Sequence, residues 1–268
     1  MQEFHYRGGA LSLTNTAVMG ILNVTPDSFS DGGRFDRPDA ALIRAAEIER
    51  EGAAILDIGG QSTRPGYTLL SPEEEWARLC PVLTNLTVTI PVSVDTFYPA
   101  VAKRAIEAGA SIINDVSGDL QNGMIPLAAA TGAGLILLHA GDPQDAIAFF
   151  DEALQEAAKA GLREEQLCFD IGVGFGKTRE QDLESIRNIP RLCQAYPTVP
   201  ILCGASRKRV VAAAAGTTVP PVERLGGTVA LHTAAQLSGA RILRAHDVKE
   251  SVQAATAIDS LMRGGQDA

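Results

Sequence analysis

Short apolar runs alternate with helix-like stretches along the whole of this 268-residue chain, and this alternation limits the possible folds more than any other feature. The apolar runs are residues 17–24, 53–59, 90–95, 111–116, 134–139, 166–172, 199–204 and 240–246. Continuous apolar runs of this length are typical of parallel strands buried on both faces. The stretches between them carry helix signals, such as an N-cap at Ser71 followed by Pro72 and an acidic first turn.

Eight strands separated by helices predict an α/β protein with a (β/α)₈ TIM barrel. A doubly wound sheet, the alternative, would place a glycine-rich turn after the first strand, where this chain has NVTPDS. Gly8 and Gly9 indicate a short N-terminal hairpin that closes the bottom of the barrel. Because no linker-like or low-complexity stretch interrupts the pattern, we expect residues 1–268 to form a single domain.

Charge and composition exclude several classes of partner. The formal net charge of −9 disfavours binding to nucleic acid and to anionic membranes. No apolar run reaches membrane-spanning length, the N-terminus lacks the apolar stretch of a signal peptide, and the four cysteines form no C-x-x-C pair. We therefore expect a cytoplasmic protein that acts on small molecules.

Polar residues end nearly every apolar run. They are Asn23, Ser62, Thr63, Arg64, Asp95, Asn114, His139, Asp170, Ser206, Arg207, Lys208, Arg244 and His246. Singly, each has an ordinary structural explanation, such as a helix cap or a hydrogen-bonded core histidine. In a (β/α)₈ barrel, however, the C-terminal strand ends meet at one rim, which is where such barrels bind their ligands. The set as a whole therefore favours a binding or active site.

The chemistry of these residues suggests the kind of ligand. Asp95, Asn114 and Asp170 suit a flat heterocycle rich in N–H donors. A cationic group suits phosphate or carboxylate; it consists of Arg64, Arg207, Lys208, Arg244 and His246. The sequence therefore predicts a heterocycle that bears an anionic tail.

The sequence argues against two other kinds of site. Residues 172–178, GVGFGKT, resemble a phosphate-binding loop, but the first glycine of that motif is replaced by Ile171. We interpret these glycines as a tight loop that lets backbone approach a ligand. The four histidines show no H-x-x-x-H pair, so zinc-site spacing is also weak.

Seven blocks, in order, resemble the dihydropteroate synthases, a family of pterin-binding barrels. They are GILNVTPDSFSDGG (20–33), GGQSTRPG (59–66), VSVDT (92–96), INDVSG (113–118), DIGVGFGK (170–177), GASRK (204–208) and RAHDV (244–248). The resemblance implies a (β/α)₈ barrel, usually a homodimer. It also implies Mg²⁺-dependent condensation of 6-hydroxymethyl-7,8-dihydropterin pyrophosphate with p-aminobenzoate, which gives 7,8-dihydropteroate and pyrophosphate.

The resemblance further implies a role for each matching residue. Asp95, Asn114, Asp170 and Lys208 would bind the pterin. Asn23, Arg244 and His246 would anchor pyrophosphate and Mg²⁺, with Asn23 as the metal ligand and Thr63 and Arg64 beside them. Phe29, Pro65, Phe175 and Ser206 would form the p-aminobenzoate pocket, and Asp27 and Asp31 would help to close the first loop. Asp95, Asp170, Lys208, Arg244 and His246 would be the catalytic set.

The chain departs from the family pattern at Gln61, which replaces a usual glutamate, and at Ile171, which replaces a usual proline. The loop after His139 is also shorter than in the family. Two alternatives therefore stay open. One is a pterin-binding paralogue with weak or no synthase activity. The other is a methyltetrahydrofolate methyltransferase-type barrel, which shares the Asp/Asn set but does not need DSFSDGG, SRK or R-x-HDV.

Overall fold

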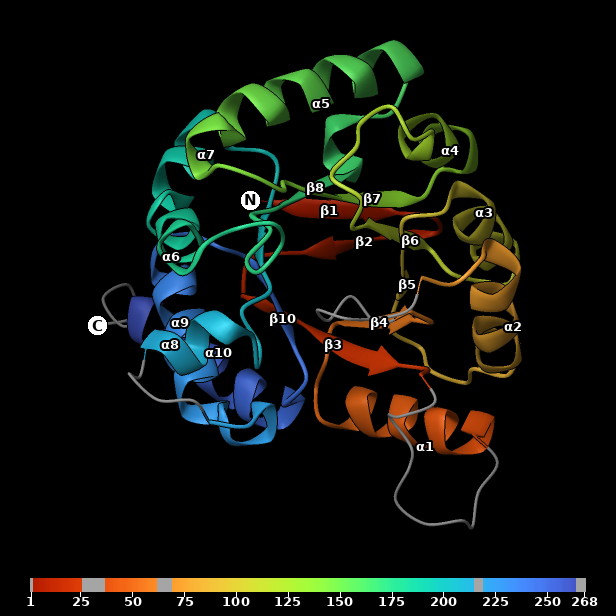
Figure 1. Ribbon diagram of the computed structural model, residues 1–268, viewed down its shortest axis with the longest axis horizontal. Helices are drawn as coiled ribbons and strands as arrows, with labels where there is room; N and C mark the ends of the chain where they lie inside the picture. The colour runs from red at the N-terminus through yellow and green to blue at the C-terminus, as the bar shows by residue number, and fades with distance from the viewer. Residues whose placement is uncertain (1, 26–36, 62–68, 215–218, 264–268) are drawn as a thin grey trace.

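The computed structural model describes residues 2–25, 37–61, 69–214 and 219–263, and within them eight parallel strands close into a barrel (Figure 1). The strands are β3 (Ala17–Asn23), β4 (Ile55–Gly59), β5 (Val92–Thr96), β6 (Ile112–Asp115), β7 (Gly134–Leu138), β8 (Leu167–Asp170), β9 (Ile201–Cys203) and β10 (Ile242–Ala245). They pair in sequence order, and β10 closes the ring against β3. The (β/α)₈ prediction is confirmed, because each strand lies within one of the eight apolar runs or extends it by a single residue.

Helices surround the barrel (Figure 1). They are α1 (Arg37–Arg50), α2 (Pro72–Leu83), α3 (Pro99–Glu107), α4 (Met124–Thr131), α5 (Ala146–Ala160), α6 (Arg179–Arg187), α7 (Ile189–Ala195), α8 (Arg209–Ala214), α9 (Leu225–Leu237) and α10 (Val248–Arg263). The helix α2 begins as its sequence predicts. Ser71 Oγ accepts a hydrogen bond from the Glu74 backbone N–H, and the Glu74 carboxylate accepts one from the Ser71 N–H.

Alternate residues of each strand face opposite sides, which gives the barrel two separate cores. In β4, Leu56 and Ile58 pack in the large cluster beneath the helices, whereas Ile55 packs in a smaller cluster inside the barrel. The position between Leu56 and Ile58 therefore faces the barrel interior, and it is occupied by Asp57. The interior is apolar at the level of Ile55 and becomes polar toward the strand ends.

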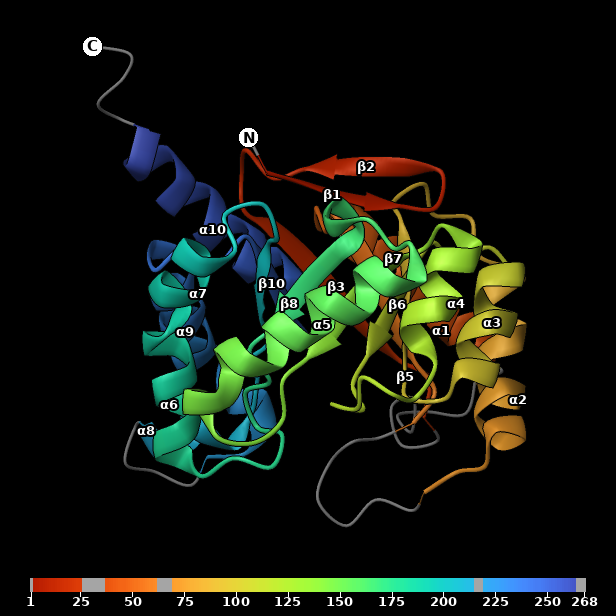
Figure 2. The same cartoon turned by 90° about the horizontal axis from the view of Figure 1, so that it is seen from above.

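A hairpin of β1 (Glu3–Tyr6) and β2 (Gly9–Ser12) covers the end of the barrel at which the strands begin (Figure 2). Phe4 is fully buried in the interior cluster with Met19 and Ile55. Gly134, the first residue of β7, allows this approach, because a Cβ there would lie 2.8 Å from the His5 carbonyl oxygen. The predicted hairpin is thus confirmed, with its turn at Arg7 and Gly8 and with Gly9 already in β2.

Within the described residues, none of the helices is both long enough and apolar enough to span a bilayer.

Candidate active site

Strand register brings the predicted polar residues to one rim of the barrel. Asn23 pairs with Gly59 across β3 and β4, and Gly59 pairs with Asp95 across β4 and β5. Asp95 in turn pairs with Asn114 on β6, so three predicted site residues lie at one level of the barrel. Asp170 ends β8 on the other side. The rim therefore collects carboxylates and amides that the sequence separates by up to 147 positions, Asn23 to Asp170.

Arg244 of β10 lies between two carboxylates. Its Nε donates to Asp57 Oδ2 at 2.7 Å, and its Nη2 pairs with Asp57 and with Asp95. Burial disfavours the charge on Arg244, but the nearby carboxylates of Asp57 and Asp95 outweigh it and raise the pKa of the guanidinium. The cation is therefore fixed in place in a site from which most water is excluded.

Of the two predicted carboxylates, Asp170 is buried and Asp95 is largely buried. Burial raises the pKa of Asp95, while Arg244 acts to lower it and Asp57 to raise it. Burial likewise raises the pKa of Asp170, whereas Lys208 and the Gly172 N–H, which donates to Asp170 Oδ1 at 2.8 Å, act to lower it. Cations and a backbone donor thus oppose the effect of burial on both carboxylates.

Lys208, in the loop after β9, contacts the loop after β8. Its Nζ donates to the Val173 carbonyl oxygen and lies 4.6 Å from the centre of the Phe175 ring. Burial lowers the pKa of Lys208, and Asp170 opposes this shift. Lys208, predicted to bind the pterin, is therefore in contact with Phe175, predicted to line the p-aminobenzoate pocket.

The glycine-rich loop after β8 is held by a lysine that the sequence analysis did not select. Lys177 is buried, and its Nζ donates to the carbonyl oxygens of His139, at 2.6 Å, and Gly172, at 3.2 Å. Gly172 has φ 63°, and a Cβ there would lie 2.0 Å from the His139 oxygen. Burial lowers the pKa of Lys177 to about 8. The motif is thus a tight loop, and its lysine holds the loop to the backbone of His139, just after β7.

Hydrogen bonds and an ion pair join the turn after β9, which carries Ser206, Arg207 and Lys208, to the residues just before α10. Ser206 Oγ lies 3.0 Å from His246 Nδ1 and accepts from the His246 backbone N–H at 3.1 Å. Arg207 has φ 58°, and among the described residues it alone is a non-glycine with positive φ. Its guanidinium pairs with Asp247. The Arg207 side chain is therefore held in place by this ion pair.

His139 and the two positions that depart from the family pattern have structural partners. The His139 ring packs edge-on against Phe149, with 5.2 Å between ring centres, and burial lowers its pKa to about 4. It is a core histidine. Gln61 Oε1 accepts from the Leu70 N–H at 2.7 Å, and Ile171 is buried in the large core cluster.

Part of the predicted set lies outside the described residues, namely Asp27, Phe29, Asp31, Ser62, Thr63, Arg64 and Pro65. Asn23 is half-buried at the end of β3. One functional candidate was missed, because Asp57 sits within the apolar run AAILDIG and reads as part of a strand. The only indication in the sequence is that a single charged residue interrupts a buried strand, where a charge requires a partner.

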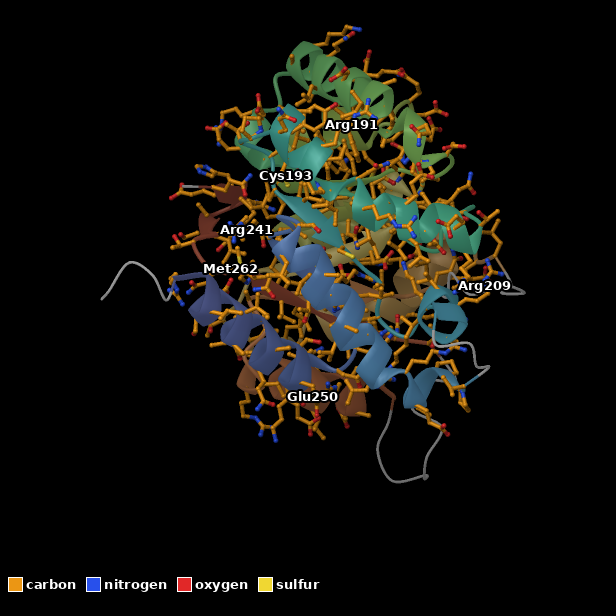
Figure 3. All side chains as sticks on the ribbon, turned by 90° about the vertical axis from the view of Figure 1, so that its left-hand side faces the viewer. Arg191, Cys193, Arg209, Arg241, Glu250 and Met262 are labelled. Atoms are coloured by element: carbon orange, nitrogen blue, oxygen red, sulfur yellow. The ribbon has the colours of Figure 1, made fainter. Side chains whose placement is uncertain are left out.

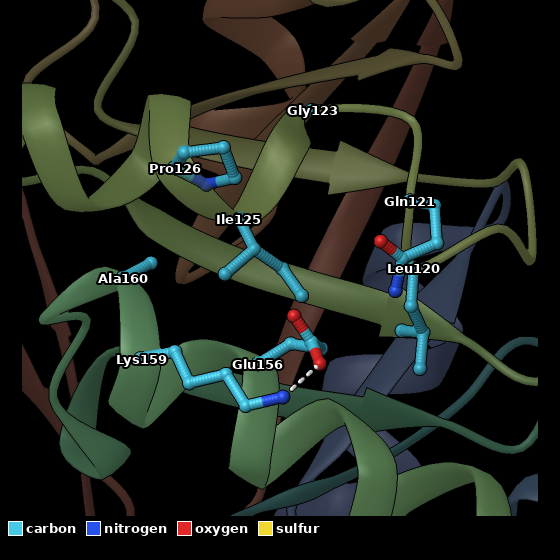
Figure 4. Close-up of a pocket in the computed structure, with 8 residues that line it drawn as sticks. All are labelled: Leu120, Gln121, Gly123, Ile125, Pro126, Glu156, Lys159 and Ala160. Atoms are coloured by element: carbon cyan, nitrogen blue, oxygen red, sulfur yellow. Dashed lines mark hydrogen bonds and ion pairs between the residues drawn. The ribbon is translucent and has the colours of Figure 1, made fainter.

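A cavity of about 300 Å³ lies elsewhere, between α4 and α5 (Figure 4). It is lined by Leu120, Gln121, Gly123, Ile125, Pro126, Glu156, Lys159 and Ala160, and an ion pair of 2.7 Å joins Lys159 to Glu156. None of the rim residues lines it. In the part of the chain that the structure describes, no cluster of three or more His, Cys, Asp or Glu side chains could hold a metal by itself.

Comparisons with known proteins agree with this geometry. Residues 19–246 match the model of a family described as pterin binding enzymes. A dihydropteroate synthase of Clostridium beijerinckii is 40% identical over 259 residues, which cover 92% of this chain and 95% of that protein. A structure of Xanthomonas albilineans dihydropteroate synthase with 4-aminobenzoic acid has a TM-score of 0.89 at 40% identity and covers 95% of this chain and 96% of that one. A second Xanthomonas albilineans structure, in complex with 7,8-dihydropteroate, has a TM-score of 0.87 at 38% identity and covers 95% and 97%.

Proposed function

The chain belongs to the dihydropteroate synthase family of pterin binding enzymes, and we propose that it condenses 6-hydroxymethyl-7,8-dihydropterin pyrophosphate with p-aminobenzoate. It is a transferase of folate biosynthesis, and its products are 7,8-dihydropteroate and pyrophosphate. One observation carries the proposal at the level of this chain's own residues. Asp95, Asn114 and Asp170 lie at one barrel rim, with Arg244 paired to Asp95 and Lys208 close enough to Asp170 to affect its pKa.

The carboxylates and the amide form the pterin part of the site. A pterin carries ring N–H groups and an exocyclic amino group, which are donors that Asp95, Asn114 and Asp170 accept. Lys208 donates to the pterin carbonyl oxygen. During the reaction the methylene carbon becomes positively charged, and the carboxylates of Asp95 and Asp170 offset this charge through the conjugated ring.

Arg244 and His246 form the anion part of the site, with Asn23 beside them. The pairs of Arg244 with Asp57 and Asp95 use Nε and Nη2, so Nη1 is left for phosphate oxygens among the described contacts. These groups stabilise the charge that develops on the leaving pyrophosphate. The weakly nucleophilic arylamine then attacks the methylene carbon, and no covalent bond to the enzyme is required.

The residues near the anion part of the site fit a Mg²⁺ ion whose ligands come mainly from the substrate. Mg²⁺ prefers oxygen ligands and commonly binds one or two protein groups together with substrate phosphates. Asn23 supplies a half-buried amide at the end of β3, so it would hold the ion with the pyrophosphate oxygens. When bound, Mg²⁺ would neutralise part of the leaving-group charge.

The arylamine pocket is proposed at Phe175 and Ser206, together with Phe29 and Pro65, which lie outside the described residues. Phe175 lies against Lys208, and Ser206 is bonded to His246. The pocket would therefore adjoin both the pterin and the anion parts of the site. Sulfonamides, which resemble p-aminobenzoate in shape, would compete for it.

The deciding experiment follows both products. Purified protein is incubated with the pterin pyrophosphate and Mg²⁺, with and without p-aminobenzoate, while dihydropteroate and pyrophosphate are measured. We expect dihydropteroate only when p-aminobenzoate is present. Pterin binding without any dihydropteroate would instead identify a non-catalytic paralogue, and methyl transfer from methyltetrahydrofolate would identify the methyltransferase class.

We also propose a cytoplasmic homodimer whose protomer is a single domain of residues 1–268. Five large apolar side chains of the described residues are more than half exposed, and three of them belong to the last two helices: Leu237 at the end of α9, and Leu261 and Met262 in the last turn of α10. Figure 3 looks onto the face that carries Met262 together with Cys193 and Arg241. Exposed apolar groups of this size favour a protein contact. Light scattering after gel filtration tests the dimer, and a monomeric mass would reject it.

A further inference from the structure

Asp57 is a buried carboxylate that takes no part in the reaction steps proposed above. It lies in the middle of β4 and is fully buried, with its side chain inside the barrel. Its strand neighbours across the ladders are Ile21 and Ser93. Burying a carboxylate costs free energy unless the group is paired. The partners of Asp57 therefore indicate its role.

Both hydrogen-bond partners of Asp57 are proposed substrate ligands. Asn114 Nδ2 donates to Asp57 Oδ2 at 3.2 Å, and Arg244 Nε donates to the same oxygen at 2.7 Å. The three residues come from β4, β6 and β10, so only the closed barrel brings them together. A single carboxylate thus contacts the pterin part and the anion part of the site.

The charge of Asp57 decides which way the Asn114 amide faces. A carboxylate beside a guanidinium accepts hydrogen bonds and donates none, so only the NH₂ end of Asn114 can face it. The other end, Asn114 Oδ1, is then directed away from Asp57. This oxygen is buried and has no hydrogen-bond partner among the described residues. Asn114 Oδ1 is therefore available to accept a hydrogen bond from a ligand.

We infer that Asp57 is a positioning residue for substrate recognition. It fixes Asn114 so that Oδ1 accepts from an N–H of the heterocycle, and it holds Arg244 at the rim. This inference rests on the proposed function, because it concerns the ligand of the same site. The fixed amide also determines specificity. The site binds a heterocycle edge that places a donor opposite Asn114 Oδ1, and it binds an edge with donor and acceptor exchanged less well.

Pterins and lumazines provide the two edges. A pterin carries a 2-amino donor beside the N1 acceptor, whereas a lumazine carries a 2-carbonyl acceptor beside an N1–H donor. An Asn114 amide fixed by Asp57 matches the pterin order. In Asp57→Asn the new amide can donate as well as accept, so Asn114 can turn over and match the lumazine order.

The test compares Asp57→Asn with a matched control, Asp259→Asn. Asp259 of α10 is also buried and also accepts from a side-chain amide, that of Gln236 at 2.9 Å, but it bonds Thr16 and not the rim. The affinities of 6-hydroxymethylpterin and 6-hydroxymethyllumazine are measured by calorimetry for both variants and for the unaltered protein. We expect the pterin-to-lumazine affinity ratio to fall about tenfold in Asp57→Asn only.

Kinetics provide a second readout. In Asp57→Asn, kcat/KM for the pterin pyrophosphate should fall about 10- to 100-fold, while KM for p-aminobenzoate stays near its original value. An unchanged affinity ratio together with an unchanged kcat/KM would overturn the inference. Dihydropteroate formation by the unaltered protein is measured alongside, so a failure of the proposed function is recognised separately.

A measurement on the unaltered protein covers the case in which Asp57→Asn does not fold. The Asn114 side-chain NH₂ resonances, assigned by their loss in Asn114→Ser, should exchange slowly with solvent before any ligand is added. The Nδ2–H that faces Asp57 should also change little when 6-hydroxymethylpterin binds. Rapid exchange, as in an exposed asparagine, would show that Asp57 does not hold the amide and would overturn the inference.

Discussion

At the scale of single residues, the rim contains an ion cluster in which each charge depends on its neighbours. Arg244 pairs with Asp57 and Asp95, and Asp170 and Lys208 offset each other. Burial disfavours every one of these charges, so the cluster is stable only as a set. The effect of a substitution on stability therefore depends on whether it leaves a charge in the cluster unpaired.

Asp95→Asn should remove catalysis with little effect on stability. Arg244 keeps its bonds to Asp57, so no buried cation is left unpaired. The variant loses the carboxylate that accepts from the pterin and offsets its developing positive charge, and we expect kcat to fall at least ~100-fold. Initial rates and thermal unfolding measure the two effects. Activity close to that of the unaltered protein would remove Asp95 from the catalytic set.

Arg244→Ala should affect both stability and anion binding. Asp57 and Asp95 would then lose their shared cation, which costs about 3–5 kcal/mol when one partner of a buried pair is removed. Pyrophosphate affinity should fall, and turnover should require more Mg²⁺. Calorimetric titration with pyrophosphate tests this, with Arg244→Lys as a control that keeps the charge but not the fork of donors. Unchanged pyrophosphate affinity in Arg244→Ala would make Arg244 a structural residue only.

Which site residues the sequence could predict depended on where they stand in a strand. Asp95 and Asp170 are at or next to the last position of their strands, and the ends of parallel strands form the ligand-binding rim of a barrel. Asp57 and Lys177 escaped notice because one lies within a strand and the other within a glycine-rich loop. Their roles depend on contacts with β6, with β10 and with His139 after β7, which only the folded chain reveals.

At the scale of elements, strands and helix starts were predictable because their causes are local. Continuous apolar runs specify buried parallel strands, and Ser71 with Glu74 specifies the start of α2. The interior of α2 contains a feature that local rules do not predict. Glu75 is fully buried against the barrel and accepts from Thr96 Oγ1 at 3.0 Å.

Glu75 should make stability depend on pH. Burial raises its pKa to about 7 from an ordinary value of 4.5. Between these two pH values the folded protein binds more protons than the unfolded chain, so stability falls as pH rises from 4.5 to 7 and is level above that. Glu75→Gln should abolish this loss, which we expect to be roughly 1–3 kcal/mol.

Denaturant unfolding at pH 5 and pH 8 provides the measurement for Glu75. The control is Glu73→Gln in the same helix, whose side chain is 74% exposed and whose substitution should leave the pH dependence intact. Identical pH dependence in Glu75→Gln and in the unaltered protein would show that another group is responsible.

At the scale of the whole molecule, the two ends of the barrel differ in composition and in task. The interior where the strands begin is apolar and is capped by Phe4, whereas the interior where they end holds Asp57, Asn114, Asp170 and Arg244. Ligand-binding loops of such barrels lie at the second end. Stability and recognition are therefore expected to respond to different substitutions.

Phe4→Ala tests this separation from the apolar end. Phe4 is fully buried among Met19, Ile112 and Ile136, so its truncation leaves a cavity and should cost about 3–5 kcal/mol of unfolding free energy. At a temperature where the variant is folded, kcat/KM for the pterin pyrophosphate should match that of the unaltered protein, because the rim residues are held by their own ion pairs. Leu11→Ala in the same hairpin is the control, and because Leu11 is only partly buried it should cost less. Denaturant unfolding and initial rates are measured on the same preparations. A loss of kcat/KM in folded Phe4→Ala would mean that packing at the bottom of the barrel sets the geometry of the rim, and the two ends would then have to be treated as one coupled unit.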